Sequence, residues 1–592
     1  MPEASTAKTT LQGSVAAEGP RWTRRSLLLA VGALGVGSAV FRRSLAALAA
    51  EGPAVTDAMI REAAWVSGME FTDSERALML EDLSRTVRGY EALRGVPIDN
   101  AVPPALRFHP AQPPSGRAAG TDGAADVEPV APRPAADDDL AFAPLRTLAG
   151  LLRAREVSSV ELTRLYLTRM ARFDTVLRCV VTRTEDLALE QAERADREIA
   201  SGTLRGPLHG VPWGVKDLFS VPGQRTTWGA TPYKDQVRPE KATVVARLER
   251  AGAPLLAKLS VGALAWGDVW FEGMTRNPWR TEQGASGSSA GSAAATAAGL
   301  AAFAIGTETW GSIVSPCTRC GVTGLRPTFG RVSRHGAMAL AWSMDKVGPI
   351  ARTADDCALV FRAIQGSDPL DPSAVDGPFD WNQDLDVRSL RVGFVESLFE
   401  KDRAADAEGP EAQASAREWR AFDLRTLDVL RDLGVKLVPV ELPDQYPVDS
   451  MAFILTAEAS AAFDDLTRSG RDDLLERQVR DAWPNVLRQG QLIPAVEYIR
   501  ANRIRTLLMQ AMERLFSSVD VYVVPSFGGD NLLLTNLTGH PAVVLPNGFR
   551  SGDGTPTSIS FVGRLFGEAA ALALAHAYQR ATDFHRRRPP LA

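Results

Sequence analysis

The side chains best suited to chemistry in this chain are one lysine and two serines, each set among glycines in a short segment. The three segments are Gly210-Val-Pro-Trp-Gly-Val-Lys216-Asp217, Gly287-Ser288-Ser289-Ala-Gly-Ser292 and Gly306-Thr-Glu-Thr-Trp-Gly-Ser312. A serine hydroxyl is a poor nucleophile until a neighbouring group takes its proton, and a lysine does so only where burial or nearby positive charge lowers its pKa. Glycines let backbone N–H groups approach a reacting oxygen closely. Together the segments indicate acyl-transfer chemistry.

Each segment also has an ordinary explanation when it is read alone. Lys216 follows a short apolar run and is expected at a strand end, where it could be a surface lysine paired with Asp217. Residues 284–300 are rich in Gly, Ser and Ala, which is typical of a flexible linker or of a helix packed closely on its neighbour. The alanines of residues 290–304 favour a helix with Ser288 and Ser289 at its N-terminus, where backbone N–H groups point outward. All three motifs in this order occur by chance much more rarely than any one of them, and their joint occurrence therefore favours a common site.

With its further motifs the chain resembles the amidase signature family, from about Leu145 to Ala581. The further motifs are Cys320-Gly-Val-Thr-Gly-Leu-Arg-Pro327, Ser343-Met-Asp-Lys-Val-Gly-Pro349 with Ala351-Arg-Thr-Ala-Asp355, and Gly539-His-Pro-Ala542. The resemblance implies an α/β fold whose large mixed β-sheet is flanked by helices on both faces. Short β-branched segments that alternate with helical ones independently favour a layered α/β fold.

The resemblance also implies a role for each candidate site residue. Ser312 would be the nucleophile, Lys216 the base, and Ser288 the hydroxyl that carries a proton between them. The resemblance places Ser288 in a cis peptide bond with Gly287, and Ser289 beside them as a supporting residue. The oxyanion hole would be formed by the backbone N–H groups of Thr309, Trp310, Gly311 and Ser312.

The chemistry of a lysine base agrees with these roles. Lys216 must be neutral to accept a proton, so its site must exclude water or lie near another cation. After attack on an amide carbonyl, the same relay can return a proton to the departing nitrogen, which an amide needs in order to leave. We therefore expect a small-molecule amide substrate and neither a metal nor an organic cofactor.

Histidine and cysteine offer rival chemistries. None of the six histidines lies in a metalloprotease motif or beside a nucleophile elbow, and we interpret His209 and His540 as structural. Cys317 and Cys320 form a CxxC pair, but a zinc site would need two more ligands at similar spacing. A redox pair stays open, and a packed loop after Ser312 is favoured.

Three positions near the nucleophile depart from the family pattern. Glu308 stands where many members have Asp, and Trp310 replaces a glycine. Val314 occupies a position that is Arg in many members, which removes a guanidinium near Ser312. We expect the Trp310 ring to shape the acyl pocket and the hydrogen bonding behind Ser312 to differ.

The first 50 residues read as an export signal of the twin-arginine type. Arg24 and Arg25 precede an apolar run over residues 26–41, and small residues follow over residues 45–50. The pattern predicts a periplasmic or otherwise extracytoplasmic protein with transient contact with the export machinery. An uncleaved membrane anchor is the alternative, although the run is short for a full span.

The rest of the chain divides by composition. We expect a helical extension over residues 51–108, a Pro/Ala/Asp-rich linker over residues 109–139 and the amidase domain over residues 140–592. Ser158 and Glu161 predict a capping box at the start of a helix. The strands predicted later in the domain are 392–395, 435–438, 519–524 and 542–545, and the helices are 418–433 and 497–515.

Bulk composition narrows the function further. The net charge of −5 argues against binding to nucleic acid, and four cysteines in 592 residues exclude a disulfide scaffold. The sequence therefore predicts an exported amidase that acts on carboxylic amide bonds, which could form a homodimer. The alternatives are the A-type subunit of a glutamine-dependent amidotransferase, which the export signal disfavours, and a non-catalytic exported binding protein, which the intact triad disfavours.

Overall fold

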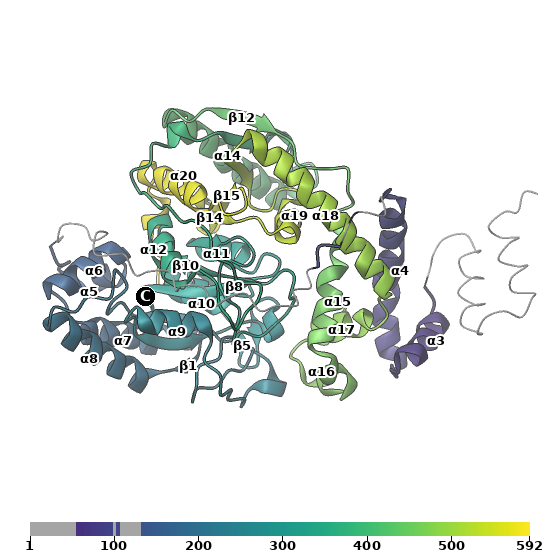
Figure 1. Ribbon diagram of the computed structural model, residues 1–592, viewed down its shortest axis with the longest axis horizontal. Coiled ribbons are helices and arrows are strands. Elements are labelled where there is room, and N and C mark those ends of the chain that lie inside the picture. The colour runs from purple at the N-terminus through teal and green to yellow at the C-terminus, as the bar shows by residue number, and fades with distance from the viewer. Residues whose placement is uncertain (1–54, 99–101, 103, 107–131, 592) are drawn as a thin grey trace, which may run out of the picture. The chain divides into compact units, whose positions relative to one another are not determined.

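The computed structural model describes residues 55–98, 102, 104–106 and 132–591. The chain divides into two compact units, Met1–Arg88 and Gly89–Ala592 (Figure 1). The predicted export signal and most of the predicted linker lie outside the described residues.

Helix α3 (Asp57–Ser67) and the start of helix α4 (Asp73–Gly95) are the described elements of the first unit. Thr56 caps α3 by accepting a hydrogen bond from the Met59 N–H. Arg76 on α4 forms an ion pair with Asp57 on α3, with 2.6 Å between Nε and Oδ1. Both helices fall within the predicted helical extension of residues 51–108.

The second unit is built on one eleven-stranded mixed sheet. In sheet order the strands are β1 (Val180–Arg183), β3 (Leu255–Leu259), β2 (Trp213–Lys216), β8 (Phe303–Glu308), β10 (Lys346–Ala351), β9 (Thr323–Arg326), β14 (Ala542–Phe549), β15 (Pro556–Gly563), β13 (Val521–Pro525), β11 (Val392–Val395) and β12 (Leu437–Val440). Strand β2 runs parallel to both β3 and β8, whereas β8, β10, β9, β14 and β15 pair antiparallel in turn. Two small pairs lie apart from this sheet: β4 (Val269–Trp270) with β5 (Gly273–Met274), and β6 (Arg276–Asn277) with β7 (Arg280–Gly284).

Helices cover the sheet on both faces. The second unit's α-helices are α5 (Asp137–Ala141), α6 (Leu145–Ala154), α7 (Ser159–Leu177), α8 (Glu185–Ala200), α9 (Thr243–Arg250), α10 (Ala290–Ala297), α11 (Val314–Cys320), α12 (Ala354–Ile364), α13 (Glu396–Glu400), α14 (Pro410–Asp432), α15 (Phe453–Ala462), α16 (Asp464–Arg468), α17 (Trp483–Gly490), α18 (Ala495–Ser518), α19 (Asn531–Thr538) and α20 (Glu568–Ala581). Thr323 and Gly324 are adjacent on β9 and therefore face opposite sides. Thr323 accepts a hydrogen bond from Gln579 on α20, whereas the α-carbon of Gly324 faces Cys317 on α11. The predicted α/β fold with a flanked mixed sheet is confirmed.

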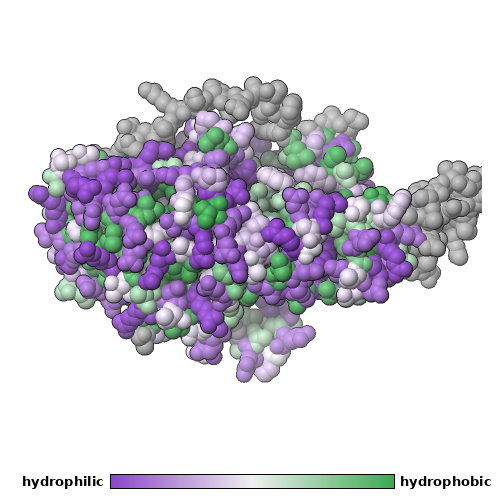
Figure 2. All heavy atoms as spheres, turned by 90° about the horizontal axis from the view of Figure 1, so that it is seen from below, coloured by the Kyte–Doolittle hydropathy of each residue, from purple (hydrophilic) through white to green (hydrophobic). Residues whose placement is uncertain are grey.

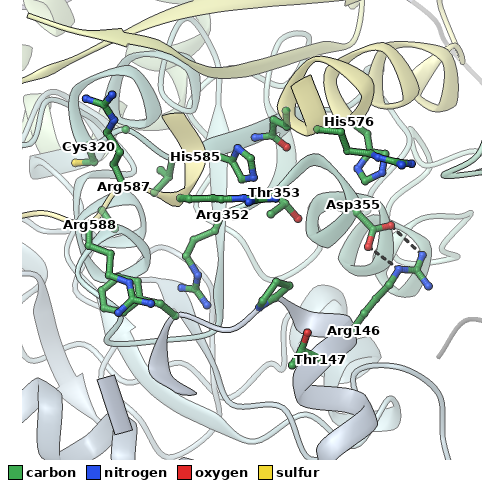
Figure 3. Close-up of a pocket in the computed structure, with 18 of the residues that line it drawn as sticks. Arg146, Thr147, Cys320, Arg352, Thr353, Asp355, His576, His585, Arg587 and Arg588 are labelled. Atoms are coloured by element: carbon green, nitrogen blue, oxygen red, sulfur yellow. Dashed lines mark hydrogen bonds and ion pairs between the residues drawn. The ribbon is translucent and has the colours of Figure 1, made fainter. Parts of the chain in front are cut away.

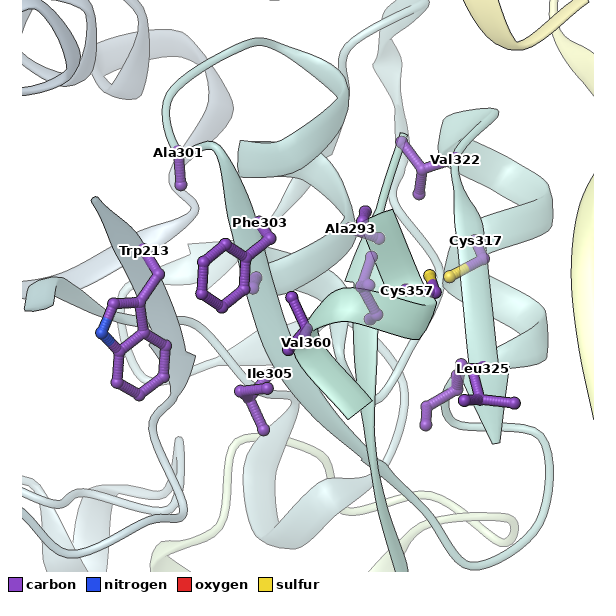
Figure 4. Close-up of a cluster of buried hydrophobic side chains, with 14 of the residues drawn as sticks. Trp213, Ala293, Ala301, Phe303, Ile305, Cys317, Val322, Leu325, Cys357 and Val360 are labelled. Carbon is purple, nitrogen blue, oxygen red and sulfur yellow. The ribbon is translucent and has the colours of Figure 1, made fainter. Parts of the chain in front are cut away.

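Neighbouring strands of the sheet are also held together by apolar side-chain contacts. The rings of Trp213 on β2 and Phe303 on β8 stack with centroids 5.9 Å apart (Figure 4). On the face shown in Figure 2, hydrophilic residues predominate and hydrophobic ones are scattered among them. Within the described ranges, no helix is both long and apolar enough to cross a bilayer.

Local signals at helix ends explain where the elements begin and stop. Ser158 caps α7 by accepting a hydrogen bond from the Glu161 N–H, as the capping box predicts. Helix α10 ends at Ala297 rather than near residue 304, because Gly299 takes a left-handed conformation (φ +64°) and the chain then turns into β8. Strand β12 starts two residues later than predicted, since the Val435 N–H closes α14 on the Leu430 carbonyl.

A short helix begins inside the predicted linker. Helix α5 begins at Asp137, within the expected linker of residues 109–139. Asp138 forms an ion pair with Arg169 on α7, and the Tyr166 hydroxyl donates to the Ala141 carbonyl. Three acidic residues in the first turn suit the positive end of a helix dipole, a signal that the linker composition obscured.

Candidate active site

The sheet brings the three glycine-rich segments together. Lys216 is the last residue of β2, which pairs parallel with β8 next to the segment that carries Ser312. Ser288 and Ser289 immediately precede α10, as predicted from its alanine-rich sequence. The Ser289 N–H donates to the Ser312 carbonyl at 3.2 Å, so the two serine segments lie side by side.

The Lys216 ammonium group is fully buried among hydroxyls. Its Nζ lies 2.8 Å from Ser288 Oγ, 3.0 Å from Ser289 Oγ and 2.8 Å from Thr307 Oγ1. Burial lowers the pKa of Lys216 to about 7, against the opposing negative charges of Asp345 and Glu308. A substantial fraction of this lysine is therefore an uncharged amine near neutral pH, able to accept a proton.

The Ser288 hydroxyl forms a hydrogen bond with Lys216 but none with Ser312. The Gly287–Ser288 peptide bond is cis, as the family resemblance implies. Position 287 accepts only glycine, because a Cβ there would lie 1.8 Å from the Gly267 carbonyl oxygen. The Ser312 hydroxyl forms no hydrogen bond with any described residue, so its link to Ser288 is through the neighbouring backbone.

The backbone between β8 and α11 presents a row of free N–H groups. Within the part of the chain that the structure describes, none of the four N–H groups of residues 309–312 donates a hydrogen bond. The next two N–H groups, of Ile313 and Val314, both donate to Glu308 Oε2 at 2.8 and 2.9 Å. Such unpaired donors beside a serine are suited to an oxyanion.

Glu308 anchors this loop from behind. Its Oε1 accepts hydrogen bonds from Arg326 on β9 and Asn536 on α19, each at 2.8 Å. Burial by itself raises the pKa of Glu308, but the Arg326 guanidinium together with the hydrogen bonds from the Val314 N–H and Asn536 outweighs this, and the pKa is lowered to about 2. The guanidinium behind this loop is thus that of Arg326, which lies in the quoted motif from Cys320 to Pro327.

Sequence reasoning missed two residues that hold the site. Thr307 contacts the lysine through its hydroxyl, and Asp345 accepts a hydrogen bond from Thr309 Oγ1 at 2.6 Å. The other oxygen of Asp345 accepts from the N–H groups of Leu340 and Ala341. Thr307 lies in the motif Gly306–Ser312 and Asp345 in the motif Ser343–Pro349, so both residues could have been chosen as candidates. Neither motif, however, predicts which side chain each residue contacts.

A pocket of about 210 Å³ opens beside these residues. Thr307 and Thr309 lie on its wall, together with apolar side chains that include Leu218 and Met338. Trp342 also lines it and is half exposed, whereas Trp310, which we expected to shape an acyl pocket, is 45% exposed and lies outside its lining. Lys216, Ser288 and Ser312 line neither this pocket nor a larger cavity of about 680 Å³ elsewhere in the unit.

His335 lines the pocket of about 210 Å³, whereas the two histidines interpreted as structural and the CxxC cysteines have other partners. His209 is buried against Glu198 and Arg205, and His540 stacks on Phe516. Cys317 and Cys320 are buried, unpaired thiols on α11 rather than in a loop, and burial raises their pKa. No cluster of three or more His, Cys, Asp or Glu side chains in the described ranges is arranged to hold a metal ion.

Comparison with known proteins places this site in a family. A family model described as Amidase matches residues 161–534. The A-type subunit of the glutamyl-tRNA(Gln) amidotransferase from Moorella thermoacetica is 36% identical over 497 residues, 76% of this chain and 99% of that relative. The protein of the same name from a Roseiflexus species (strain RS-1) is 37% identical over 480 residues, 74% of this chain and 96% of the relative.

Solved structures agree with the family match. The native peptide amidase from Stenotrophomonas maltophilia has a TM-score of 0.65 and 30% identity, covering 76% of this chain and 98% of that chain. A bacterial aryl acylamidase of the amidase signature family shares the fold, with a TM-score of 0.65 and 22% identity over 75% of this chain and 97% of that chain. The chain therefore belongs to the amidase signature family, which confirms the resemblance found in the sequence.

Proposed function

We propose that this protein cleaves carboxylic amide bonds with Ser312 as nucleophile and a relay through Ser288 to Lys216. The observation that carries the proposal is the buried Lys216 Nζ at 2.8 Å from Ser288 Oγ, with no carboxylate of a described residue in ion-pair contact. A lysine in such a place is costly to keep charged, which suits a base and suits no surface role.

The reaction proceeds in two halves. Ser312 Oγ attacks the amide carbonyl carbon, its proton moves to Ser288 Oγ, and the Ser288 proton moves to Lys216 Nζ. The negative oxygen is stabilised by the free N–H groups of residues 309–312. When the C–N bond breaks, the relay returns the proton to the departing nitrogen, and an ester on Ser312 remains. Water then attacks the ester, releases the acid and restores the serine.

The Ser312 hydroxyl forms no hydrogen bond with a described residue, and this is compatible with the proposed reaction steps. Catalytic hydrogen bonds are often long or absent without substrate and tighten in the complex. We infer that substrate entry moves Ser312 Oγ toward Ser288, whose segment it already adjoins through the Ser289 N–H.

Labelling with a fluorophosphonate probe tests the nucleophile. Ser312→Ala should abolish the covalent adduct, as read by intact mass. Ser292→Ala is the matched control, because Ser292 lies in the same glycine-rich segment but donates to the Ile305 carbonyl. An undiminished adduct in Ser312→Ala would remove Ser312 from the role, and loss of the adduct in both variants would point to general damage.

A second candidate is the A-type subunit of a glutamine-dependent amidotransferase. Both relatives reported above carry that name, so the comparisons favour this candidate over a free-standing hydrolase. Both candidates share the amide-cleaving half of the mechanism and differ in where the ammonia goes. The predicted export signal, which counts against this candidate, awaits its own test by cell fractionation of a variant with Arg24→Lys and Arg25→Lys.

Ammonia release separates the two candidates. The purified chain should be assayed on glutamine and on a panel of primary, peptide C-terminal and aryl amides, with and without amidotransferase partner subunits. Turnover of an amide by the chain alone supports the hydrolase. Glutamine turnover only with partner subunits and tRNA supports the amidotransferase.

A further inference from the structure

A second cavity of the second unit has six arginines in its lining and contains none of the residues of the proposed reaction. It measures about 680 Å³. We call it the arginine pocket after the arginines in its lining: Arg146, Arg352, Arg580, Arg586, Arg587 and Arg588. Only two carboxylates line it, Asp355 and Asp384, in a chain whose net charge is −5. Positive charge is therefore concentrated here against the trend of the whole molecule.

Three of these arginines are balanced by carboxylates. Arg146 forms a bidentate pair with Asp355 at 2.6 and 2.8 Å, drawn as dashed lines in Figure 3. Arg588 pairs with Asp139 at 2.8 Å, and Arg580 lies 4.0 Å from Asp384 on the exposed rim. These pairs account for every carboxylate of the lining.

The other three arginines form no ion pair in direct contact with a carboxylate of a described residue, although the charge of Arg352 acts on the buried Asp356 carboxylate. Arg352, which follows β10, is only 7% exposed; its terminal nitrogens donate to the carbonyls of Thr296, Ala301 and Ala143, and its Nε has no partner. Arg587 lies over the rings of Phe549 and Phe584, which hold a guanidinium without neutralising it. Arg586 likewise forms no ion pair within the described part of the chain.

A buried histidine nitrogen adds a second unsatisfied group. His585 lies on the same C-terminal segment as Arg587 and Arg588, and its Nδ1 is buried with no hydrogen-bond partner. Burial lowers the pKa of His585 to about 4, so the ring is neutral and the charge of the pocket comes from arginine alone. Figure 3 shows His585 between Arg587 and Thr353, with Arg352 reaching toward Arg588.

We propose that the arginine pocket binds a small anion that carries two or more phosphate groups. The guanidinium groups without an ion-pair partner come from two separate segments, residue 352 and residues 586–587, so a single carboxylate could not satisfy them. The cavity volume also lies within the ~300–1,000 Å³ of small-molecule sites. Guanidinium binds phosphate oxygens in a bidentate fork, and phosphate keeps its charge throughout the physiological pH range.

The arginine pocket is separate from the candidate active site. Its lining includes Ala297 and Cys320, the last residues of α10 and α11, whereas Ser289 and Ile313 precede the first residues of those helices. Two turns of helix therefore separate the two sites, roughly 12 Å at the usual rise per residue. Binding can be measured without any amide substrate, so the test is independent of the proposed function.

Calorimetric titration of the full chain with inorganic pyrophosphate at constant ionic strength tests this proposal. We expect saturable binding at one site, weakened at least tenfold in the double variant Arg586→Gln/Arg587→Gln. The charge-matched control is Arg197→Gln/Arg431→Gln, two exposed arginines on α8 and α14 outside the pocket, and it should bind as the wild type does. Should the first variant fail to fold by circular dichroism, Arg586→Gln gives the same comparison with a severalfold loss expected.

Two results would overturn the proposal. One is the absence of saturable pyrophosphate binding, or equal affinity in the pocket and control variants. The other comes from a parallel titration with citrate: citrate binding as tight as pyrophosphate would show a pocket for polycarboxylates rather than phosphates.

Discussion

Two fully buried lysines lie on neighbouring parallel strands, and they differ in what surrounds them. Lys216 on β2 contacts the hydroxyls of Ser288, Ser289 and Thr307. Lys258 on β3 pairs with Asp217, with 2.7 Å between Nζ and Oδ1, and also donates to Thr226 Oγ1 at 2.9 Å. One buried ammonium has a counterion and the other has none among the described residues.

The difference teaches that the partner, rather than burial alone, decides what a buried lysine can do. Burial lowers the pKa of both side chains. At Lys258 the Asp217 carboxylate opposes that shift, and the ion pair holds two strand ends together. At Lys216 only hydroxyls and a carbonyl are within reach, so losing the proton costs no ion pair. The same type of side chain thus forms a structural ion pair at Lys258 and is the proposed proton acceptor at Lys216.

Removing Lys216 should have the largest effect on catalysis. We expect Lys216→Met to reduce kcat/KM by roughly 10²- to 10⁴-fold, the range associated with a general base. The fold should remain, because no ion pair is broken. Steady-state rates on a cleaved amide, together with thermal unfolding, provide the measurement, and a variant that keeps its rate would show that another base operates.

Removing Lys258 should act on stability instead. Lys258→Met leaves the Asp217 carboxylate buried without its cation, which costs about 3–5 kcal/mol of unfolding free energy. Adding Asp217→Asn should recover part of this loss, because the uncompensated charge disappears. Chemical denaturation gives the values. Equal loss of kcat in Lys258→Met and Lys216→Met, at full folding of both, would end the distinction between the two lysines.

The smallest effects should come from one hydroxyl beside each lysine. Thr307→Val removes a partner of Lys216 and should lower kcat severalfold while moving the pH profile, since the ammonium loses part of its solvation. Thr226→Val is the matched change beside Lys258 and should cost about 1 kcal/mol of stability with no change in the profile. Equal pH profiles for the two variants would show that Thr307 has no part in setting the lysine pKa.

Sequence reasoning reached the elements with strong local signals. The capping residues Ser158 and Glu161 located the start of α7, and Val392–Val395 coincides with β11. The strand order could not be predicted in the same way, because it places β14 next to β9, more than two hundred residues apart in sequence. Pairing between distant segments depends on tertiary packing, which local patterns do not encode.

In the candidate site, too, local motifs could be predicted from the sequence but contacts between distant segments could not. Lys216, Ser288 and Ser312 were found because each lies in a recognisable glycine-rich motif. The contacts that hold them were not predicted, since Arg326 reaches Glu308 from β9, and Asp345, just before β10, accepts a hydrogen bond from Thr309. Val314 alone did not show that the Arg326 guanidinium lies behind the Ser312 loop, where it pairs with Glu308.

The rate of fluorophosphonate labelling as a function of pH tests most directly whether Lys216 is the base, because the probe needs no proton for a leaving amine. Burial lowers the pKa of Lys216 to about 7. We therefore expect the labelling rate to rise about tenfold per pH unit below pH 7 and to level off above it, because the amine then becomes free to accept a proton. The same titration of Lys216→Met should give a slow rate without that inflection. An inflection near pH 7 that persists in Lys216→Met, or a wild-type rate that is flat from pH 5.5 to 9, would exclude Lys216 as the base.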